Sequence, residues 1–336
     1  MIYIQDSTNG FHPKWIDFCI ENDLEYKIVD FYDSSLINVI KKGDIALWHF
    51  HHNDYAATKF AKSLIHALSI KGVKTFPSLN MAWHFDDKIA QKYLLESIGA
   101  PLVNTYVFYK KNEALQWLKE RKEFPLVFKL TGGAGASNVK LLKSRVEANK
   151  YVEYMFSKGV PKQPVKEKII DSILNFKKKA SIKTSIDILK SVCKIFIKQG
   201  VNRQFGNERG YFYIQDFIPN LDCDYRIIVI DGKAFAIKRM IRKNDFRASG
   251  SGNIIYDINE DLSEPLKLAF DICDKLKFDC CAFDFVLDGN DWKIIEISYG
   301  FASSAYLNCP GYWERNLNWK SGKFTPEYFM INPFCN

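Results

Sequence analysis

Two acidic residues near the end of the chain are spaced so that they could share a cation. Apolar runs at positions 281–298 predict a hairpin, and if its loop is 289–291, Asp284 lies directly across from Glu296. Directly opposed residues lie about 5 Å apart at Cβ, and a period of two places Ser298 on the same face. Two carboxylates in apolar surroundings need a cation between them or a raised pKa, and Mg²⁺ suits such a site. The alternative is that both acids face solvent.

A second candidate is a lysine inside an apolar strand. Lys129 lies in the predicted strand 125–130, where a positive charge is costly unless it meets an anion. The loop that follows, 131–137, has small residues that allow backbone N–H groups to approach phosphate oxygens. Its spacing matches neither a P-loop nor a dinucleotide fingerprint. An outward-facing edge strand and an ordinary turn are the alternatives. The loop's glycines are Gly132, Gly133 and Gly135.

Arginines follow on the strands beyond residue 210. The segment Asp224-Tyr-Arg226, then Arg239, then Asp245-Phe-Arg247 bring cations towards a glycine-rich stretch at 249–252. Arginine matches planar anions such as phosphate and carboxylate. For any one of these side chains, a solvated strand face is the competing interpretation.

The elements that must position these residues change character along the chain. Residues 1–85 alternate strand and helix signals, which predicts a small parallel α/β domain. Residues 86–160 contain the Lys129 strand and the glycine-rich loop, and 161–205 form a separate helical segment. From 206 to 336 strands predominate, and an aromatic tail without regular pattern follows the last hairpin. The predicted fold class is α/β, with an α+β C-terminal part.

The net charge of +8 is unevenly distributed. Residues 161–205 contain eleven Lys or Arg and three Asp or Glu, so the remaining chain is close to neutral. This pattern indicates an enzyme with a basic insertion, and it argues against a uniformly basic nucleic-acid binder. The insertion could recruit an acidic macromolecule or a membrane surface, or it could be a solvated helical face.

The remaining composition indicates a cytoplasmic enzyme. Apolar runs are too short to cross a bilayer, and the first residues do not resemble a signal peptide. The eight cysteines lack zinc-type spacing, so we interpret them as reduced, buried thiols, with Cys281 pointing into a core.

Seven motifs in this order resemble the ATP-grasp family, over roughly residues 75–300. The similarity is greatest to the branch that contains ribosomal-protein glutamate ligases. It implies an ATP-grasp fold with an N-terminal parallel α/β domain and an inserted basic helical segment. The motifs are Asp87-Lys88 before Gly99-Ala100-Pro101, the Lys129 strand and loop, Gln215-Asp216-Phe217-Ile218, Asp224-x-Arg226, Asp245-Phe246-Arg247, Asp284 and Glu296-Ile297-Ser298.

The resemblance implies ATP and Mg²⁺, or Mn²⁺ in its place, as cofactors. Residues expected to bind ATP are Lys88 and Lys129 at the phosphates, the loop with Gly132, Gly133, Gly135 and Ser137, Gln215, Asp216, Phe217 and Ile218 at the adenine, and Asp224 near the ribose. Expected catalytic residues are Arg226, Arg239 and Arg247, the last near the γ-phosphate. Expected metal ligands are Asp284, Glu296 and Ser298. Asp216 stands where the family usually has Glu, and Ser298 where it usually has Asn.

The implied activity is an ATP-dependent ligase that joins a carboxylate to an amine through an acylphosphate. The acid could be a uronic acid of a surface polysaccharide or its precursor, since the tail after Tyr299 interleaves aromatic and polar residues. Histidines 49, 51 and 52 follow a predicted strand and could help to bind the acceptor. Tail packing and a plain surface loop are the alternatives.

Three other functions fit parts of the pattern. The acceptor could be a peptide or protein carboxylate. A kinase that leaves the phosphate on its product would have the same nucleotide-binding half. A non-catalytic nucleic-acid-binding protein would use the basic insertion, but the aromatic residues lie outside that segment.

Overall fold

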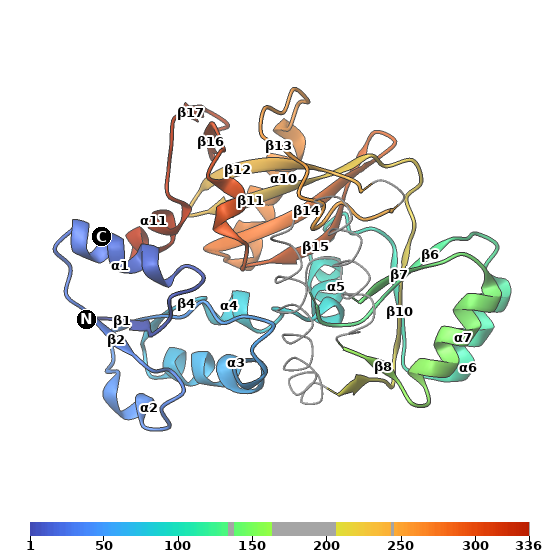
Figure 1. Cartoon of the computed structure of the whole chain (residues 1–336), viewed down its shortest axis with the longest axis horizontal. Helices are drawn as coiled ribbons and strands as arrows, with labels where there is room; N and C mark the ends of the chain where they lie inside the picture. The colour runs from blue at the N-terminus through green and yellow to red at the C-terminus, as the bar shows by residue number, and fades with distance from the viewer. Residues whose placement is uncertain (134–137, 163–205, 243–244, 336) are drawn as a thin grey trace, which may run out of the picture. The chain divides into compact units, whose positions relative to one another are not determined.

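The computed structural model describes residues 1–133, 138–162, 206–242 and 245–335. Its chain groups into two compact units (Figure 1). Unit 1 combines Met1–Val103 with Ile218–Asn336, and unit 2 is Asn104–Phe217. The division differs from the predicted boundary at residue 85, because helix α5 (Lys88–Ser97) belongs to unit 1. The predicted basic insertion lies almost wholly outside the described residues.

Unit 1 contains a parallel sheet built from the first 76 residues, in the strand order β2-β1-β3-β4. This arrangement agrees with the predicted parallel α/β pattern. Asp54 begins the longest helix of this region, where its carboxylate accepts a hydrogen bond from the Ala57 amide at 3.0 Å. The strands are β1 (Ile2–Gln5), β2 (Tyr26–Val29), β3 (Ile45–Leu47) and β4 (Lys74–Phe76), and the helices are α1 (His12–Glu21), α2 (Leu36–Val39), α3 (Tyr55–Ile70) and α4 (Leu79–Ala82).

The second sheet of unit 1 has seven strands in the order β15-β14-β11-β12-β16-β17, with β13 also paired to β12. Helix α10 (Ser263–Leu276) packs against β11 and β14. The sequence Asp231-Gly232 between two apolar runs predicts a hairpin turn, and this turn is present between β11 and β12, with both residues at positive φ. The strands are β11 (Cys223–Ile230), β12 (Lys233–Met240), β13 (Ile254–Ile255), β14 (Cys280–Asp288), β15 (Asp291–Ser298), β16 (Gly311–Glu314) and β17 (Trp319–Ser321).

The β14–β15 hairpin has the predicted pairing but a different turn. Asp288 pairs with Asp291, so the turn has two residues, where the sequence suggested three. A register shift between Asp284 and Phe285 adds one residue on β15, which restores the pairing of Asp284 with Glu296. The expected juxtaposition of the two acids is therefore observed, and a bulge produces it.

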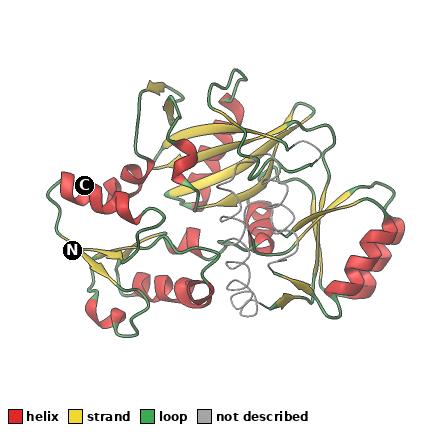
Figure 2. Cartoon of the chain, in the orientation of Figure 1, coloured by secondary structure: helices red, strands yellow, loops and turns green. Residues whose placement is uncertain are grey.

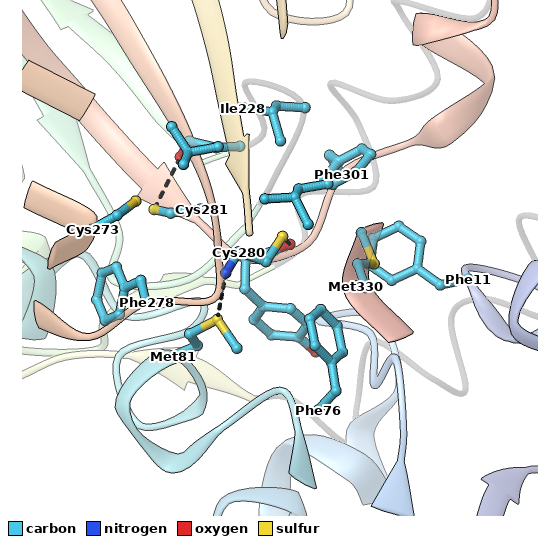
Figure 3. Packing of buried hydrophobic residues seen from close by; sticks show 14 of the residues in the cluster. Phe11, Phe76, Met81, Ile228, Cys273, Phe278, Cys280, Cys281, Phe301 and Met330 are labelled. Carbon is cyan, nitrogen blue, oxygen red and sulfur yellow. Dashed lines mark hydrogen bonds between the residues drawn. The ribbon is translucent and has the colours of Figure 1, made fainter. Parts of the chain in front are cut away.

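An apolar core connects the two sheets of unit 1 (Figure 3). The Cys280 amide donates to the Met81 sulfur at 3.2 Å, and the Tyr299 hydroxyl donates to the Phe50 carbonyl at 2.8 Å. Cys281 lies beside Cys273 of α10, so the expectation that Cys281 points into a core is confirmed (Figure 3). Burial raises the pKa of the Cys281 thiol well above its usual value, which keeps the sulfur unreactive.

Unit 2 is a four-stranded antiparallel sheet in the order β5-β10-β6-β7, beside helices α6 and α7 (Figure 2). The ring of Phe128 lies 4.9 Å from Tyr151 of α7, and Phe108 lies 5.4 Å from Trp117 of α6. Both helices therefore cover the face that carries Phe128. The elements are β5 (Thr105–Phe108), α6 (Lys111–Glu120), β6 (Leu126–Lys129), β7 (Val139–Leu142), α7 (Arg145–Met155), β8 (Val160–Pro161), β9 (Asn207–Glu208) and β10 (Phe212–Asp216).

Two local expectations need correction. The sequence predicts a helix over residues 112–122 with Asn112 as its cap, but helix α6 begins after Lys110, with no side-chain cap. The tail predicted as irregular contains β16, β17 and helix α11 (Pro326–Ile331), because β16 pairs with the edge of β12 and gains a partner far away in sequence. A local sequence pattern does not show this distant pairing of β16 with β12.

Candidate active site

Charged side chains from four adjacent strands line one face of the seven-stranded sheet. We call these five residues the charged row: Arg239 on β12, Asp224 and Arg226 on β11, Asp284 on β14 and Glu296 on β15. Strand register brings them together, since Asp224 lies opposite Arg239, Arg226 opposite Asp284, and Asp284 opposite Glu296. Opposed residues point to the same face, so the row follows from pairing alone.

Asp284 is the centre of this row. Its Oδ1 accepts from Arg226 Nε at 2.5 Å, and its Oδ2 accepts from Arg226 Nη2 at 2.7 Å and lies 3.0 Å from Arg239 Nη2. Burial alone would raise the pKa of the Asp284 carboxyl, but Arg226 and Arg239 outweigh it and hold that pKa well below its usual range. Asp284 is therefore an anion at neutral pH.

Arg239 also holds Asp224 through two hydrogen bonds of 2.6 Å. Burial raises the pKa of Asp224, and Arg239 offsets this effect only partly. The buried Arg239 thus bridges two aspartates, which gives it a structural role within the row besides the expected catalytic one.

Glu296 has a looser environment than Asp284. Lys88 begins α5, where the Asp87 carboxylate caps the helix by accepting from the amides of Ile89 and Ala90. From this position Lys88 Nζ lies 3.5 Å from Glu296 Oε1. Lys88 is 5% exposed and Glu296 29%. The structure therefore brings together the predicted phosphate-binding Lys88 and the predicted metal ligand Glu296.

Asp284 and Glu296 could hold a metal ion only if water or phosphate oxygens complete its coordination. Asp284 and Glu296 supply two opposed carboxylates, and no group of three or more His, Cys, Asp or Glu that could hold a metal occurs in the described part of the chain. The Ser298 hydroxyl donates to the Gly300 carbonyl at 2.9 Å and accepts from the Gly300 amide at 3.1 Å. Mg²⁺ commonly binds one or two carboxylates together with water and phosphate oxygens, which fits this pair.

Lys129 lies on the face of the unit 2 sheet that points away from α6 and α7. It is 4% exposed, and its ammonium donates to Gln215 Oε1 at 2.6 Å. The Gln215 amide nitrogen in turn donates to Thr105 Oγ1 at 3.1 Å. Lys129 therefore points along the sheet towards β10, and the alternative of an outward-facing edge strand is excluded because β6 pairs on both sides.

The ends of the glycine-rich loop are held by polar contacts. Glu208 accepts from the amide of Thr131 at 3.0 Å and from its hydroxyl at 2.7 Å, and it also accepts from Tyr211. On the other side, Asn138 donates to the carbonyl of Gly132 at 3.0 Å. Gly133 has a φ of +111°, which favours glycine there. Gly135 and Ser137, also predicted to bind ATP, lie outside the described residues.

Comparison of the sequence with protein-family models and with curated proteins finds no match. Solved structures do match. A RimK domain ATP-grasp protein of Sphaerobacter thermophilus is 14% identical, with a TM-score of 0.53 over 88% of this chain and 90% of that one. D-alanine–D-alanine ligase of Bacillus anthracis is 14% identical, with a TM-score of 0.51 over 89% and 85%. The ATP-grasp ligase PsnB complexed with minimal precursor is 11% identical, with a TM-score of 0.56 over 100% and 98%.

The chain has the ATP-grasp fold. The fold predicted from the order of the motifs is therefore confirmed. Within this fold, the segment predicted to hold adenine ends strand β10 and passes from unit 2 into unit 1. Asp216 accepts from Arg121 at 2.8 Å and from Asn104 at 3.2 Å. The roles of Gln215, Asp216, Phe217 and Ile218 at an adenine stay predictions.

Arg247 forms an ion pair with Asp245, two residues before it. Its Nη2 lies 2.8 Å from Asp245 Oδ2, and its Nε also donates to Asp245. Burial by itself would raise the pKa of Asp245, but hydrogen bonds and charge from Arg247 lower it. Its expected role near a γ-phosphate stays a prediction.

Of the two features expected to bind the acceptor, the aromatic tail and His49 are packed, while His51 is exposed. His49 stacks on Phe11 at 3.7 Å, and burial lowers the pKa of His49 well below its usual value. In the tail, Tyr306 is buried, and the rings of Tyr312 and Phe324 lie 5.5 Å apart. These contacts favour the packing alternatives for both segments.

Sequence reasoning missed the supporting residues Thr105, Glu208 and Asn138. Each is a polar residue with a partner distant in the chain: Gln215 for Thr105, Thr131 for Glu208, and the Lys162 carbonyl for Asn138. The only local signal was the polar side chain of Thr105 at the start of an apolar strand, which is too common to single it out.

No helix among the described residues has the length and apolar character of a membrane span.

Proposed function

We propose that this chain is an ATP-dependent ligase that forms an amide from a carboxylate and an amine through an acylphosphate. The observation that carries the proposal is the opposed pair Asp284 and Glu296 in the charged row, within an ATP-grasp fold that also buries Lys129. Neighbours with this fold were solved with ATP or with Mg and ADP. They support ATP and Mg²⁺ as the cofactors here, and Mn²⁺ as a substitute for Mg²⁺ is part of our proposal.

Each part of the proposed site has a chemical task. Lys129 and Lys88 would bind phosphate oxygens and hold the nucleotide in position. Arg226, at the half-buried end of the row, would offset negative charge that develops as a phosphoryl group moves to the substrate carboxylate. Mg²⁺ would be held by Asp284 and Glu296 and would neutralise phosphate charge. Such a reaction needs no covalent nucleophile. Six of the seven cysteines that the structure describes are buried, and Cys335 is exposed.

The acid substrate remains a proposal of its own. A uronic acid of a surface polysaccharide was suggested by the aromatic tail, but that tail packs most of its rings inward; Trp319, at 42% exposed, is the main exception. A peptide or protein carboxylate is the second candidate, because the neighbour PsnB was solved with a precursor peptide. Both belong to the same proposed reaction class. Binding of an acidic macromolecule or a membrane surface to the basic insertion stays a proposal, because residues 163–205 lie outside the described residues.

The test is to incubate the protein with MgATP, a pool of carboxylates and a pool of amines, and to follow ADP and phosphate. ADP and phosphate release that requires both an acid and an amine supports the ligase. Formation of AMP and pyrophosphate would overturn the acylphosphate route, and a phosphorylated product without free phosphate would identify a kinase. Separate pools of uronic acids and peptides distinguish the two acids.

Two variants connect the activity to the site. Lys129→Ala and Glu296→Ala should each abolish turnover. The matched controls are Lys110→Ala and Glu113→Ala, which remove an exposed ion pair, 77% and 56% accessible, and should retain full activity. Activity that survives both site variants would remove the assignment.

A further inference from the structure

Tyr306 lies over the same face of the seven-stranded sheet as the charged row. Its ring packs at 5.3 Å against the ring of Phe235 on β12 and at 5.3 Å against that of Phe301. Phe235 and Arg239 are four residues apart on β12, so a strand period of two points both to one face. Tyr306, at 4% exposed, therefore covers the part of this face that continues the row.

The chain around Tyr306 is held by hydrogen bonds to its backbone. Tyr306 is the last residue of the 3-10 helix η1 (Ser303–Tyr306). The Tyr256 hydroxyl donates to the carbonyl of Ala305 at 3.0 Å, and the Cys309 amide donates to the carbonyl of Tyr306 at 3.0 Å. Together with the two phenylalanine rings, these contacts keep the Tyr306 ring on the sheet.

Strand register brings Tyr306 towards Arg226. Phe235 pairs with Ile228 on β11, and Arg226 is two residues from Ile228 on the same face of that strand. Burial is the largest influence on Tyr306 and raises the pKa of its hydroxyl, whereas Arg226 and Arg239 lower that pKa only in part. The hydroxyl therefore keeps its proton at neutral pH, within the field of the charged row, and can donate a hydrogen bond.

Arg226 offers a second donor for an anion. It binds Asp284 with Nε and Nη2, and the planar guanidinium directs Nη1 away from that carboxylate. The side chain of Arg226 is 22% exposed, so an anion can reach it. In the described part of the chain, no oxygen accepts a hydrogen bond from the Tyr306 hydroxyl. A charged donor and a neutral donor thus occur together, an arrangement that suits an oxyanion.

We propose that Tyr306 donates a hydrogen bond to an oxygen of the anion that Arg226 binds during the reaction. This inference rests on the proposed function, in which that anion is either the substrate carboxylate or the phosphoryl group that passes to it from ATP. The tyrosine keeps its proton and transfers no group; it stabilises negative charge on oxygen. A neutral donor contributes most where water is excluded, which the burial of Tyr306 provides.

The experiment compares Tyr306→Phe with the unaltered full chain in the MgATP assay with carboxylate and amine pools. The substitution keeps the ring and removes only the hydroxyl, so kcat/KM should fall at least about tenfold, while MgADP affinity, measured by calorimetry, should not change. A loss of MgATP affinity alone assigns the contact to the phosphoryl group, and a higher KM for the acid pool alone assigns it to the carboxylate. Tyr26→Phe on β2 is the matched control and should retain activity and affinity.

The outcomes separate this role of Tyr306 from the proposed function. If the unaltered protein shows no turnover, the proposed function fails and the role of Tyr306 fails with it. If it turns over and Tyr306→Phe has the same kcat/KM, Tyr306 only fills the core, and the inference is wrong while the proposed function stands. An equal loss of MgATP and MgADP affinity would show a disturbed nucleotide site and would also overturn the inference. If Tyr306→Phe does not fold, Tyr306→Met, which also lacks the hydroxyl, makes the same comparison.

Discussion

The two units hold their buried cations in opposite ways. In unit 1, the charged row interlocks Arg226 and Arg239 with the carboxylates of Asp224 and Asp284. In unit 2, Lys129 is held by a neutral amide. Arginine's planar group can bridge two carboxylates at once, so the row is self-supporting. The Lys129 ammonium donates to an amide oxygen, which is an acceptor without a formal charge. The comparison therefore contrasts arginines that pair with carboxylates in unit 1 with a lysine that donates to an amide in unit 2.

The largest expected effect is on the row itself. Asp284→Asn should lower the free energy of unfolding by about 3–5 kcal/mol, because it leaves two buried arginines with one partner fewer. Urea unfolding followed by circular dichroism measures the change. Glu296→Gln is the matched control and should cost less than about 1 kcal/mol, since Glu296 is partly exposed and its one described ion pair spans 3.5 Å. Equal losses would contradict the interlocked row.

Lys129→Met should show the reverse pattern. Stability should change by less than about 2 kcal/mol, because the apolar side chain removes the cost of burying a charge and leaves one amide oxygen without its donor. MgATP affinity should fall at least about tenfold. The surface variant Lys110→Met should alter neither quantity. A Lys129→Met protein as unstable as Asp284→Asn would remove the contrast between the units.

Acid should weaken the ion pairs that Asp284 makes in the charged row. The pKa of Asp284 in the folded chain lies below its usual value of about 3.9, so its stabilisation is complete above that value and is lost as pH falls further. The stability difference between the wild type and Asp284→Asn should therefore narrow by up to about 1.4 kcal/mol per pH unit below 3.9. Urea unfolding at pH 6, 4 and 3 tests this. If the stability difference between the wild type and Asp284→Asn became larger as the pH fell, the lowered pKa of Asp284 would be wrong.

Thr105→Val should have the smallest effect. It removes one neutral hydrogen bond to Gln215, which contributes about 1 kcal/mol to stability. Thr105→Ser keeps the hydroxyl and serves as the control. The stability difference should not depend on pH between 6 and 3, since no titrating group changes.

The hairpin of Asp284 and Glu296 shows how far local pattern reaches. Apolar alternation was enough to predict both strands, and the predicted pairing of the two acids is observed. The turn and the bulge were not predicted, and each shifts the register by one residue in opposite directions. The prediction was thus right about the pairing of Asp284 with Glu296 and wrong about the length of the turn that joins the two strands. A bulge depends on neighbouring strands, which a single hairpin sequence does not contain.

The sequence by itself determined the types of charge, their order along the chain and the strands that carry them. The order of the motifs carried the resemblance to the ATP-grasp family, and that resemblance predicted the fold. Strand period predicted the individual strands. The tertiary structure decided the partners. Arg226 meets Asp284 from 58 positions away, and Lys129 meets Gln215 from 86. Such pairs form only when sheet register brings distant strands side by side, so only the folded chain shows which polar and charged groups meet.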